Sequence, residues 1–208
     1  MSVVYTENFE PVPFDKKEIL RYCGGAENSE QLEELLDNCL GEIDGKISNR
    51  VCYCEFKISE TENGLDLGFC KTNSKLILRH LNGCDKLILF AATVGIETDR
   101  LISKYSRISP VKALMFQAIG AERIEALCDT FENKIKTQYA AEGRECVYRI
   151  SAGYGDIPLE MQKDIFKILD CPKRIGLSLN ESLLMSPTKS VTAVIGVKKT
   201  LGESYENY

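Results

Sequence analysis

The sequence predicts a mixed α+β fold, in which a long helix and several shorter helices pack on a twisted, largely antiparallel sheet. Two segments, 50–69 and 178–197, have the strand-forming and turn-forming residues of β-hairpins. Between them, residues 110–141 keep the apolar spacing of a helix longer than any other part of the chain. Because hairpins join neighbouring antiparallel strands, these segments favour an antiparallel sheet covered by helices.

The N-terminal part of the chain predicts an extended arm followed by two helices. Residues 1–13 have no regular apolar period. A short helix is predicted over 14–23, with Asp15 near its start. Asn28, followed by Gln31 three residues later, is typical of a capping box and predicts the start of a second helix.

The middle of the chain predicts strands. Residues 50–58 alternate between apolar and polar side chains, as in a half-buried strand. The pair Asn63-Gly64 predicts a hairpin turn, with 65–69 as the returning strand. Residues 85–94 form a continuous apolar run, which is typical of a central strand covered on both faces.

Three further helices are predicted from their ends and their apolar spacing. Ser74 is expected to cap a short helix, and 158–169 has an amphipathic pattern. The longest helix should start at Pro110, a residue suited to the first helical position, and end before Gly143. Its predicted packing stripe consists of Leu114, Ala118, Ala121, Leu127, Phe131 and Ile135.

The length and composition exclude several classes of protein. A chain of 208 residues suits one continuous domain, in which 1–48 form an arm and helices and 49–208 form the α+β part. The net charge of −5 and the sequence pI of about 5.2 argue against a nucleic-acid-binding surface. No apolar run approaches the roughly 20 residues that span a bilayer, so we expect no membrane segment.

The cysteines indicate a reducing compartment. There are nine of them, with no Cys-x-x-Cys pair and no signal peptide, so we expect free thiols and a cytoplasmic location. Cys52 and Cys54 share one face of a predicted strand, but His80 is the only histidine. We therefore expect small core residues here and no metal site. We also assign no catalytic residue, because no nucleophile and base stand together in the sequence.

Residues 149–154, Arg-Ile-Ser-Ala-Gly-Tyr, have a composition suited to a ligand. Small residues let a ligand approach the main chain, and an arginine offers a planar fork for a carboxylate or phosphate. The same residues also suit a strand that ends in a turn, with Asp156 capping a helix near Pro158. Residue spacing alone leaves both interpretations open.

A second segment, 176–197, favours the interpretation of residues 149–154 as a ligand-binding element. Arg149, Gly153 and Tyr154 fit an Arg-x-x-x-Gly-Tyr element, and the second segment fits Thr-Glu-Ser-x-x-Met-x-Pro-x-x-Ser-Val with Asn180 in place of Thr. The matching residues there are Glu181, Ser182, Met185, Pro187, Ser190 and Val191. In this order and spacing, the chain resembles the C-terminal activation domain of cobalamin-dependent methionine synthase.

The resemblance implies a binding site for S-adenosylmethionine. Arg149 would bind the methionine carboxylate of this cofactor, Ser151 and Gly153 would offer backbone contacts, and Tyr154 would pack on the ligand or form a hydrogen bond to it. The family has a glutamate on the long helix, which Glu125 matches, and an acid there would face the cationic end of the ligand. The alternative for Glu125, with Asp129 four residues later, is a solvent-facing acidic pair.

The resemblance also implies partners. The chain would support reductive methylation of cob(II)alamin on a separate cobalamin-binding methionine synthase module or other corrinoid protein, with an electron from flavodoxin or a similar reductase. It would be a component of that methyltransferase system rather than a complete enzyme, because the substrate, folate and cobalamin modules are not in this sequence. A docking module that does not use S-adenosylmethionine is the alternative. A methyltransferase for another substrate lacks a visible acceptor pocket.

Two family features are missing. The acid that the family has in an Asp-Trp-Thr-Pro context has no counterpart in residues 1–30, and the chain contains no tryptophan. Of the paired tyrosines that follow the second element in the family, only Tyr205 stands nearby. These departures affect the expected ligand affinity more than the expected fold.

Overall fold

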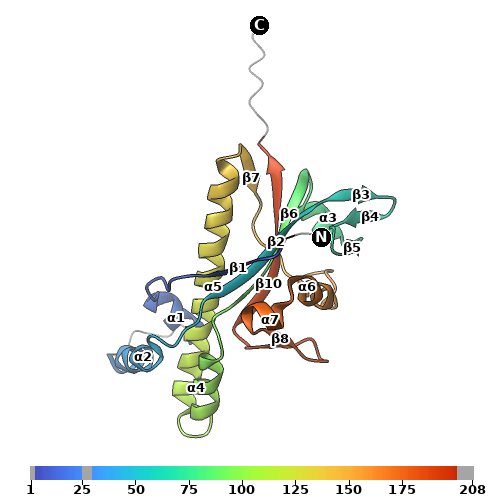
Figure 1. The fold of residues 1–208 in the computed structure, drawn as a ribbon. Helices are drawn as coiled ribbons and strands as arrows, with labels where there is room; N and C mark the ends of the chain where they lie inside the picture. Colours follow the sequence, from blue (N-terminus) through green and yellow to red (C-terminus); the bar gives the residue numbers. More distant parts are fainter. Residues whose placement is uncertain (1–2, 25–29, 201–208) are drawn as a thin grey trace.

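The structure, a computed structural model, describes residues 3–24 and 30–200 (Figure 1). The helices are α1 (Lys16–Tyr22), α2 (Glu30–Ile43), α3 (Lys75–His80), α4 (Glu97–Tyr105), α5 (Pro110–Ala140), α6 (Met161–Leu169) and α7 (Cys171–Ile175). The strands are β1 (Tyr5–Asn8), β2 (Arg50–Lys57), β3 (Ser59–Thr61), β4 (Gly64–Asp66), β5 (Lys71–Thr72), β6 (Cys84–Thr93), β7 (Arg144–Cys146), β8 (Ser178–Leu179), β9 (Met185–Ser186) and β10 (Ser190–Lys199).

The main sheet has five strands in the order β1-β2-β6-β10-β7, and each neighbouring pair is antiparallel. This arrangement confirms the predicted α+β class with a largely antiparallel sheet. The predicted central strand is also confirmed, since β6 lies in the middle and residues 87–93 are all buried. Its apolar run is continuous because helices cover both faces of the sheet at this strand.

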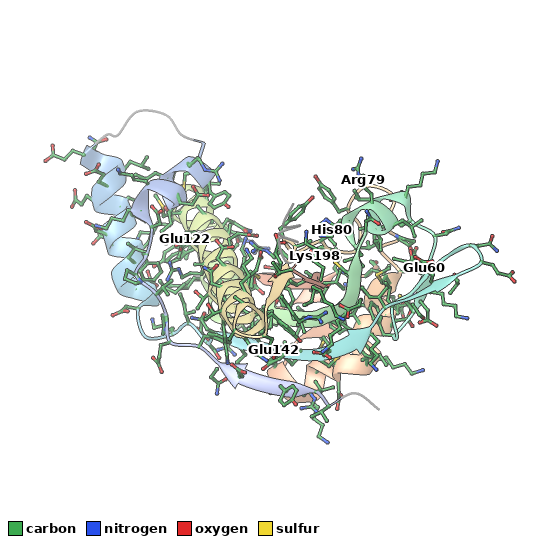
Figure 2. All side chains as sticks on the ribbon, turned by 90° about the horizontal axis from the view of Figure 1, so that it is seen from above. Glu60, Arg79, His80, Glu122, Glu142 and Lys198 are labelled. Carbon is green, nitrogen blue, oxygen red and sulfur yellow. The ribbon has the colours of Figure 1, made fainter. Side chains whose placement is uncertain are left out.

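The two faces of the sheet carry different helices (Figure 1). On one face, alternate residues such as Phe90 and Ile195 pack against α5. On the other face, Leu89 and Val194 pack against α3, α6 and α7. The N-terminal helices α1 and α2 form a third cluster with the first half of α5. Figure 2, which views the molecule from above, shows α1 and α2 beside α5, with α3 and the β3–β4 hairpin across from them.

The predicted C-terminal hairpin is wrong in its pairing. The two short strands β8 and β9 pair with each other, whereas β10 pairs with β6 and β7. Most of β10 is buried on both faces, from Ser190 to Val197 with only Val191 partly exposed. A strand covered in this way needs neighbours on both edges inside the main sheet, so β10 cannot be one arm of an isolated hairpin.

The first predicted hairpin is correct at its turn and wrong in its extent. The Asn63-Gly64 turn joins β3 to β4 in a separate three-stranded sheet, and β2 pairs instead with β1 and β6. The predicted N-terminal arm contains β1, an edge strand in which Tyr5 lies opposite Tyr53. Their rings stack with centroids 5.3 Å apart, which stabilises an edge strand that has little apolar pattern.

The helix starts predicted near Asp15 and at Ser74 are confirmed, whereas the helix predicted over 158–169 begins only at Met161. Asp15 accepts a hydrogen bond from the Glu18 N–H at 3.1 Å, and Ser74 accepts one from the Ile77 N–H at 3.2 Å. Helix α5 begins at Pro110. Its predicted stripe is mostly in the core, but Leu114 is 49% exposed. The capping box at Asn28, like Tyr205, lies outside the described residues.

Within residues 3–24 and 30–200, no helix has the length and apolar character needed to cross a bilayer. The same part of the chain has no cluster of three or more His, Cys, Asp or Glu side chains that could hold a metal ion. All nine cysteines are free thiols.

Candidate functional site

The candidate site is built on an irregularity in the edge strand that follows β7. This segment pairs with β10 at Val147, whose N–H donates to the Gly196 carbonyl at 2.9 Å. It pairs again at Ile150, which exchanges two hydrogen bonds with Val194, at 3.0 and 2.9 Å. Two residues lie between these positions on the edge strand, and one lies between them on β10. The extra residue makes a β-bulge, a feature that re-aims side chains.

At the bulge, the side chains of Tyr148 and Arg149 contact different helices. Tyr148 is 67% exposed, and its carbonyl oxygen lies 2.8 Å from the Nε2 atom of His80. The His80 and Tyr148 rings also meet edge to face, with centroids 4.3 Å apart. Arg149 points to the opposite element, α5, where its guanidinium contacts three carboxylates. His80 therefore holds the backbone at the bulge that aims Arg149.

The Arg149 guanidinium is bound by acids from three successive turns of α5. Its Nη2 atom donates to Glu125 at 2.7 Å, and its Nη1 atom donates to Asp129 and Glu132, both at 2.7 Å. These acids are spaced by four and three residues, so they form one stripe on the helix. Lys136, one turn further, forms an ion pair with Glu132 at 2.8 Å. The cluster thus has two formal positive and three formal negative charges.

Burial and hydrogen bonding act in opposite directions on these groups. Burial alone would lower the pKa of Arg149, but the hydrogen bonds to Asp129, Glu132 and Glu125 raise it. Burial alone would raise the pKa of Glu132, but hydrogen bonds from Lys136 and Arg149 hold it below its ordinary value. Both groups are therefore charged at neutral pH, which gives the site a fixed pattern of charge.

A cavity of about 470 Å³ lies beside this cluster, within the size range of small-molecule sites. It is lined by Asp129, Glu132, Asn133, Lys136, Tyr148 and Arg149. It offers an arginine and a lysine to a carboxylate, acids to a cation, and an exposed aromatic ring to a planar group. This set of donors and acceptors suits a small zwitterion or a cationic amino acid.

The other predicted site residues lie on the loop after the bulge. Ser151 borders a small apolar cavity between β10 and α6. Gly153 has a positive φ of 84°, and its N–H donates to the Ile157 carbonyl at 3.0 Å. The Tyr154 side chain is 66% exposed. The structure thus joins Arg149 to Glu125 directly, and among the described residues no hydrogen bond joins Ser151, Gly153 or Tyr154 to that pair.

The chain matches a known protein family over most of its length. Residues 73–201, more than half of the chain, match the family described as vitamin B12 dependent methionine synthase, activation domain. The chain belongs to this family. The match begins just before α3 and includes α5, the bulge and the following loop.

A solved structure also has this fold. It is described as the MetH reactivation domain bound to AdoHcy, and it superposes with a TM-score of 0.67 over 93% of this chain and 78% of that chain. The sequence identity is 15%, so the likeness concerns the fold. None of the curated proteins matches the chain significantly.

In this activation-domain chain, two residues predicted from the sequence, Arg149 and Glu125, lie in one cluster. The sequence did not indicate three further residues around it, Glu132, Lys136 and Tyr148. The acids at 125, 129 and 132 have the spacing of one helical stripe, which was a usable signal. The bulge had no such signal, because it depends on how the edge strand pairs with β10. The alternative of a solvent-facing pair of Glu125 and Asp129 holds in part, because their side chains are 47% and 63% exposed, but both acids also bind Arg149.

Asp156 caps a helix, but not the one near Pro158 that the sequence predicts. Its carboxylate accepts hydrogen bonds from the Ser74 hydroxyl at 2.6 Å and from the Lys75 and Leu76 N–H groups at 2.7 and 3.2 Å. It therefore caps α3, more than seventy residues earlier in the chain, rather than a helix near Pro158. This contact ties the loop after the bulge to α3, the helix that also carries His80.

Replacing Asp156 by Asn should lower the melting temperature at pH 7, because the amide is a weaker acceptor for these donors. The hydrogen bond from Ser74, with those from Lys75 and Leu76, lowers the pKa of Asp156 in the folded protein. Its stabilisation is therefore present above the ordinary carboxyl pKa of about 3.9 and is lost as the pH falls through the folded value. Calorimetry from pH 7 to 3 should show the deficit shrinking. If the loss of melting temperature is the same at every pH, or no larger than in the exposed control Asp44→Asn, Asp156 does not act as a cap of α3.

Proposed function

We propose that this chain binds S-adenosylmethionine and acts as a reactivation module for a separate corrinoid protein. It supports reductive methylation of cob(II)alamin on a cobalamin-dependent methionine synthase or a related corrinoid methyltransferase. Membership of the activation-domain family supports this proposal. The observation that carries it is the contact at 2.7 Å between Arg149, at the start of the Arg-x-x-x-Gly-Tyr element, and Glu125 on α5.

The residues of the site fit this ligand. S-adenosylmethionine has a carboxylate for the Arg149 fork, and an ammonium and a sulfonium for the acids of α5. When bound, it supplies an activated methyl group. The chain's own contribution is positioning, because methyl transfer from a sulfonium needs no protein base and gains most from orientation. A site made of charged side chains and open main chain is therefore sufficient.

The other components of the reaction are on partners. Cobalamin is held by the corrinoid protein, and the electron is delivered by flavodoxin or a similar reductase. We place this system in the cytoplasm, where the free thiols of the chain are stable.

Replacing Arg149 by Ala tests the ligand assignment. Loss of a charge-assisted pair is worth about 1.5–3 kcal/mol, so we expect the affinity for S-adenosylmethionine to fall roughly tenfold to hundredfold. Isothermal titration calorimetry of both proteins measures it. Arg79→Ala, an exposed arginine on α3 (Figure 2), is the matched control and should bind as the wild type does. Equal binding by the wild type and Arg149→Ala, or no binding by either, defeats the assignment.

The second candidate function is a docking module that does not use S-adenosylmethionine. The observation that favours it is the state of Arg149, whose guanidinium is already bound by three carboxylates of the chain itself. Such a module would show no thermal shift with S-adenosylmethionine, yet it would still capture a cobalamin-binding protein in a pull-down. Arg149→Ala would leave that capture unchanged.

A further inference from the structure

We propose that Asp129 occupies the place on Arg149 that the carboxylate of the ligand takes, so that the ligand binds by exchange with Asp129. This inference rests on the proposed function and adds a specificity-determining residue to the same site. It follows from how the donors of Arg149 are used, from the exposure of the three acids and from the charge of the cavity.

Three of the five N–H donors of Arg149 are used within the chain. Nη1 donates to both Asp129 and Glu132, so this nitrogen has no further hydrogen to offer. Nη2 donates to Glu125. The two remaining donors are on Nε and on Nη2, the nitrogen bound by Glu125, and Glu125 does not line the cavity. Asp129 and Glu132 both line it, so a ligand carboxylate that enters from the cavity meets Nη1 and must replace one of the acids already there.

Exposure and contacts single out Asp129 as the acid that leaves. Its side chain is 63% exposed, compared with 6% for Glu132 and 47% for Glu125. Glu132 is also tied to Lys136 at 2.8 Å, so releasing it would break a second ion pair. Asp129 lines the cavity, whereas Glu125 does not belong to the lining. Asp129 can turn into water at little cost, while Glu125 stays beside Arg149.

The charge of the cluster makes exchange more favourable than addition. Arg149 and Lys136 face Glu125, Asp129 and Glu132, which leaves one negative charge in excess. A further carboxylate added beside these three would raise the excess within a distance shorter than the screening length of about 10 Å. Exchange with Asp129 keeps the number of carboxylates on Arg149 constant. The site therefore selects ligands whose carboxylate is accompanied by a positive charge, and disfavours simple anions.

Asp129→Asn tests the exchange, with S-adenosylmethionine and decarboxylated S-adenosylmethionine as the two probes. The variant removes the competitor for Arg149, so we expect S-adenosylmethionine to bind roughly threefold to tenfold more tightly. The decarboxylated compound has no carboxylate to exchange, and the loss of a nearby negative charge should leave its affinity equal or lower. Isothermal titration calorimetry measures both. A change in overall charge alone, or a structural role of Asp129, would move both probes in the same direction.

Glu142→Gln is the matched control, because it removes one negative charge from an exposed residue just after α5 (Figure 2). It should leave both affinities unchanged. If the wild type binds S-adenosylmethionine but Asp129→Asn binds it equally or more weakly, the exchange is wrong and the proposed function stands. If neither the wild type nor Asp129→Asn binds it, both are wrong. Tighter binding of S-adenosylmethionine by Asp129→Asn than by the wild type, without tighter binding of the decarboxylated compound, supports the exchange.

Discussion

Replacing Glu122 by Ala should lower the free energy of unfolding by about 3–5 kcal/mol. Glu122 and Arg123 form an ion pair on α5, with side chains only 5% and 2% exposed. Removal of the carboxylate leaves the Arg123 guanidinium buried without its counter-charge. An unpaired buried charge costs far more than the loss of a surface ion pair.

The same pair holds the N-terminal segment against α5. Glu122 accepts a hydrogen bond from the Asp15 N–H at 3.1 Å, and Arg123 donates to the carbonyl oxygens of Val12 and Pro13. Its guanidinium carbon lies 4.2 Å from the centre of the Phe14 ring. The loss of Glu122 should therefore also detach α1, which begins just after these residues.

Urea denaturation followed by circular dichroism measures this effect. Glu97→Ala is the control, since the Glu97–Arg100 pair lies on the surface of α4 and should contribute less than about 1 kcal/mol. The double variant Glu122→Leu with Arg123→Met removes both charges, and it should recover much of the loss. A loss below about 1 kcal/mol for Glu122→Ala would show that the buried pair is not needed.

The fold was predictable where local pattern and tertiary environment agree. The run at 85–94 became the central strand because an apolar segment of that length is covered on both faces. Pro110 and Ser74 set helix starts, since their effects depend on adjacent residues. Strand pairing was not predictable for β10. Its sequence gives the strand but not its partners, which lie about fifty and one hundred residues earlier in the chain.

The site was predictable in its composition but not in its connections. Arg149 and Glu125 could be named because the family motif and a helical acid both suit a cationic amino acid. The sequence does not show that the bulge aims Arg149 at α5, or that Asp129 and Glu132 share one of its nitrogens. Nor does it place Asp156 at α3, because that contact joins a loop to a helix more than seventy residues away. Contacts of this kind depend on the assembled sheet.

Replacing Phe131 by Ala should also lower the free energy of unfolding by about 3–5 kcal/mol. The Phe131 side chain is fully buried between α5 and the sheet. Its ring centre lies 4.9 Å from that of Phe90, 5.1 Å from that of Tyr53 and 6.2 Å from that of Phe9. Truncation removes these aromatic contacts and leaves a cavity that three surrounding rings cannot easily fill. Leu114→Ala, on the exposed side of the same helix, should cost under about 1 kcal/mol.

The milder variant Phe131→Leu and the variant Arg149→Ala should separate stability from binding. Phe131 is next to Glu132, which binds Arg149. The Phe131 ring nevertheless packs against the sheet and does not line the cavity. Folded Phe131→Leu should therefore have an affinity for S-adenosylmethionine within about twofold of that of the wild type. Its unfolding midpoint should nevertheless lie at a lower urea concentration. Arg149→Ala should show the opposite pattern. Its partners Glu125 and Asp129 are exposed and can turn to water, and the buried partner Glu132 keeps its ion pair with Lys136. Equal losses of stability and affinity in both variants would mean that the acids of α5 and its core face form one cooperative unit.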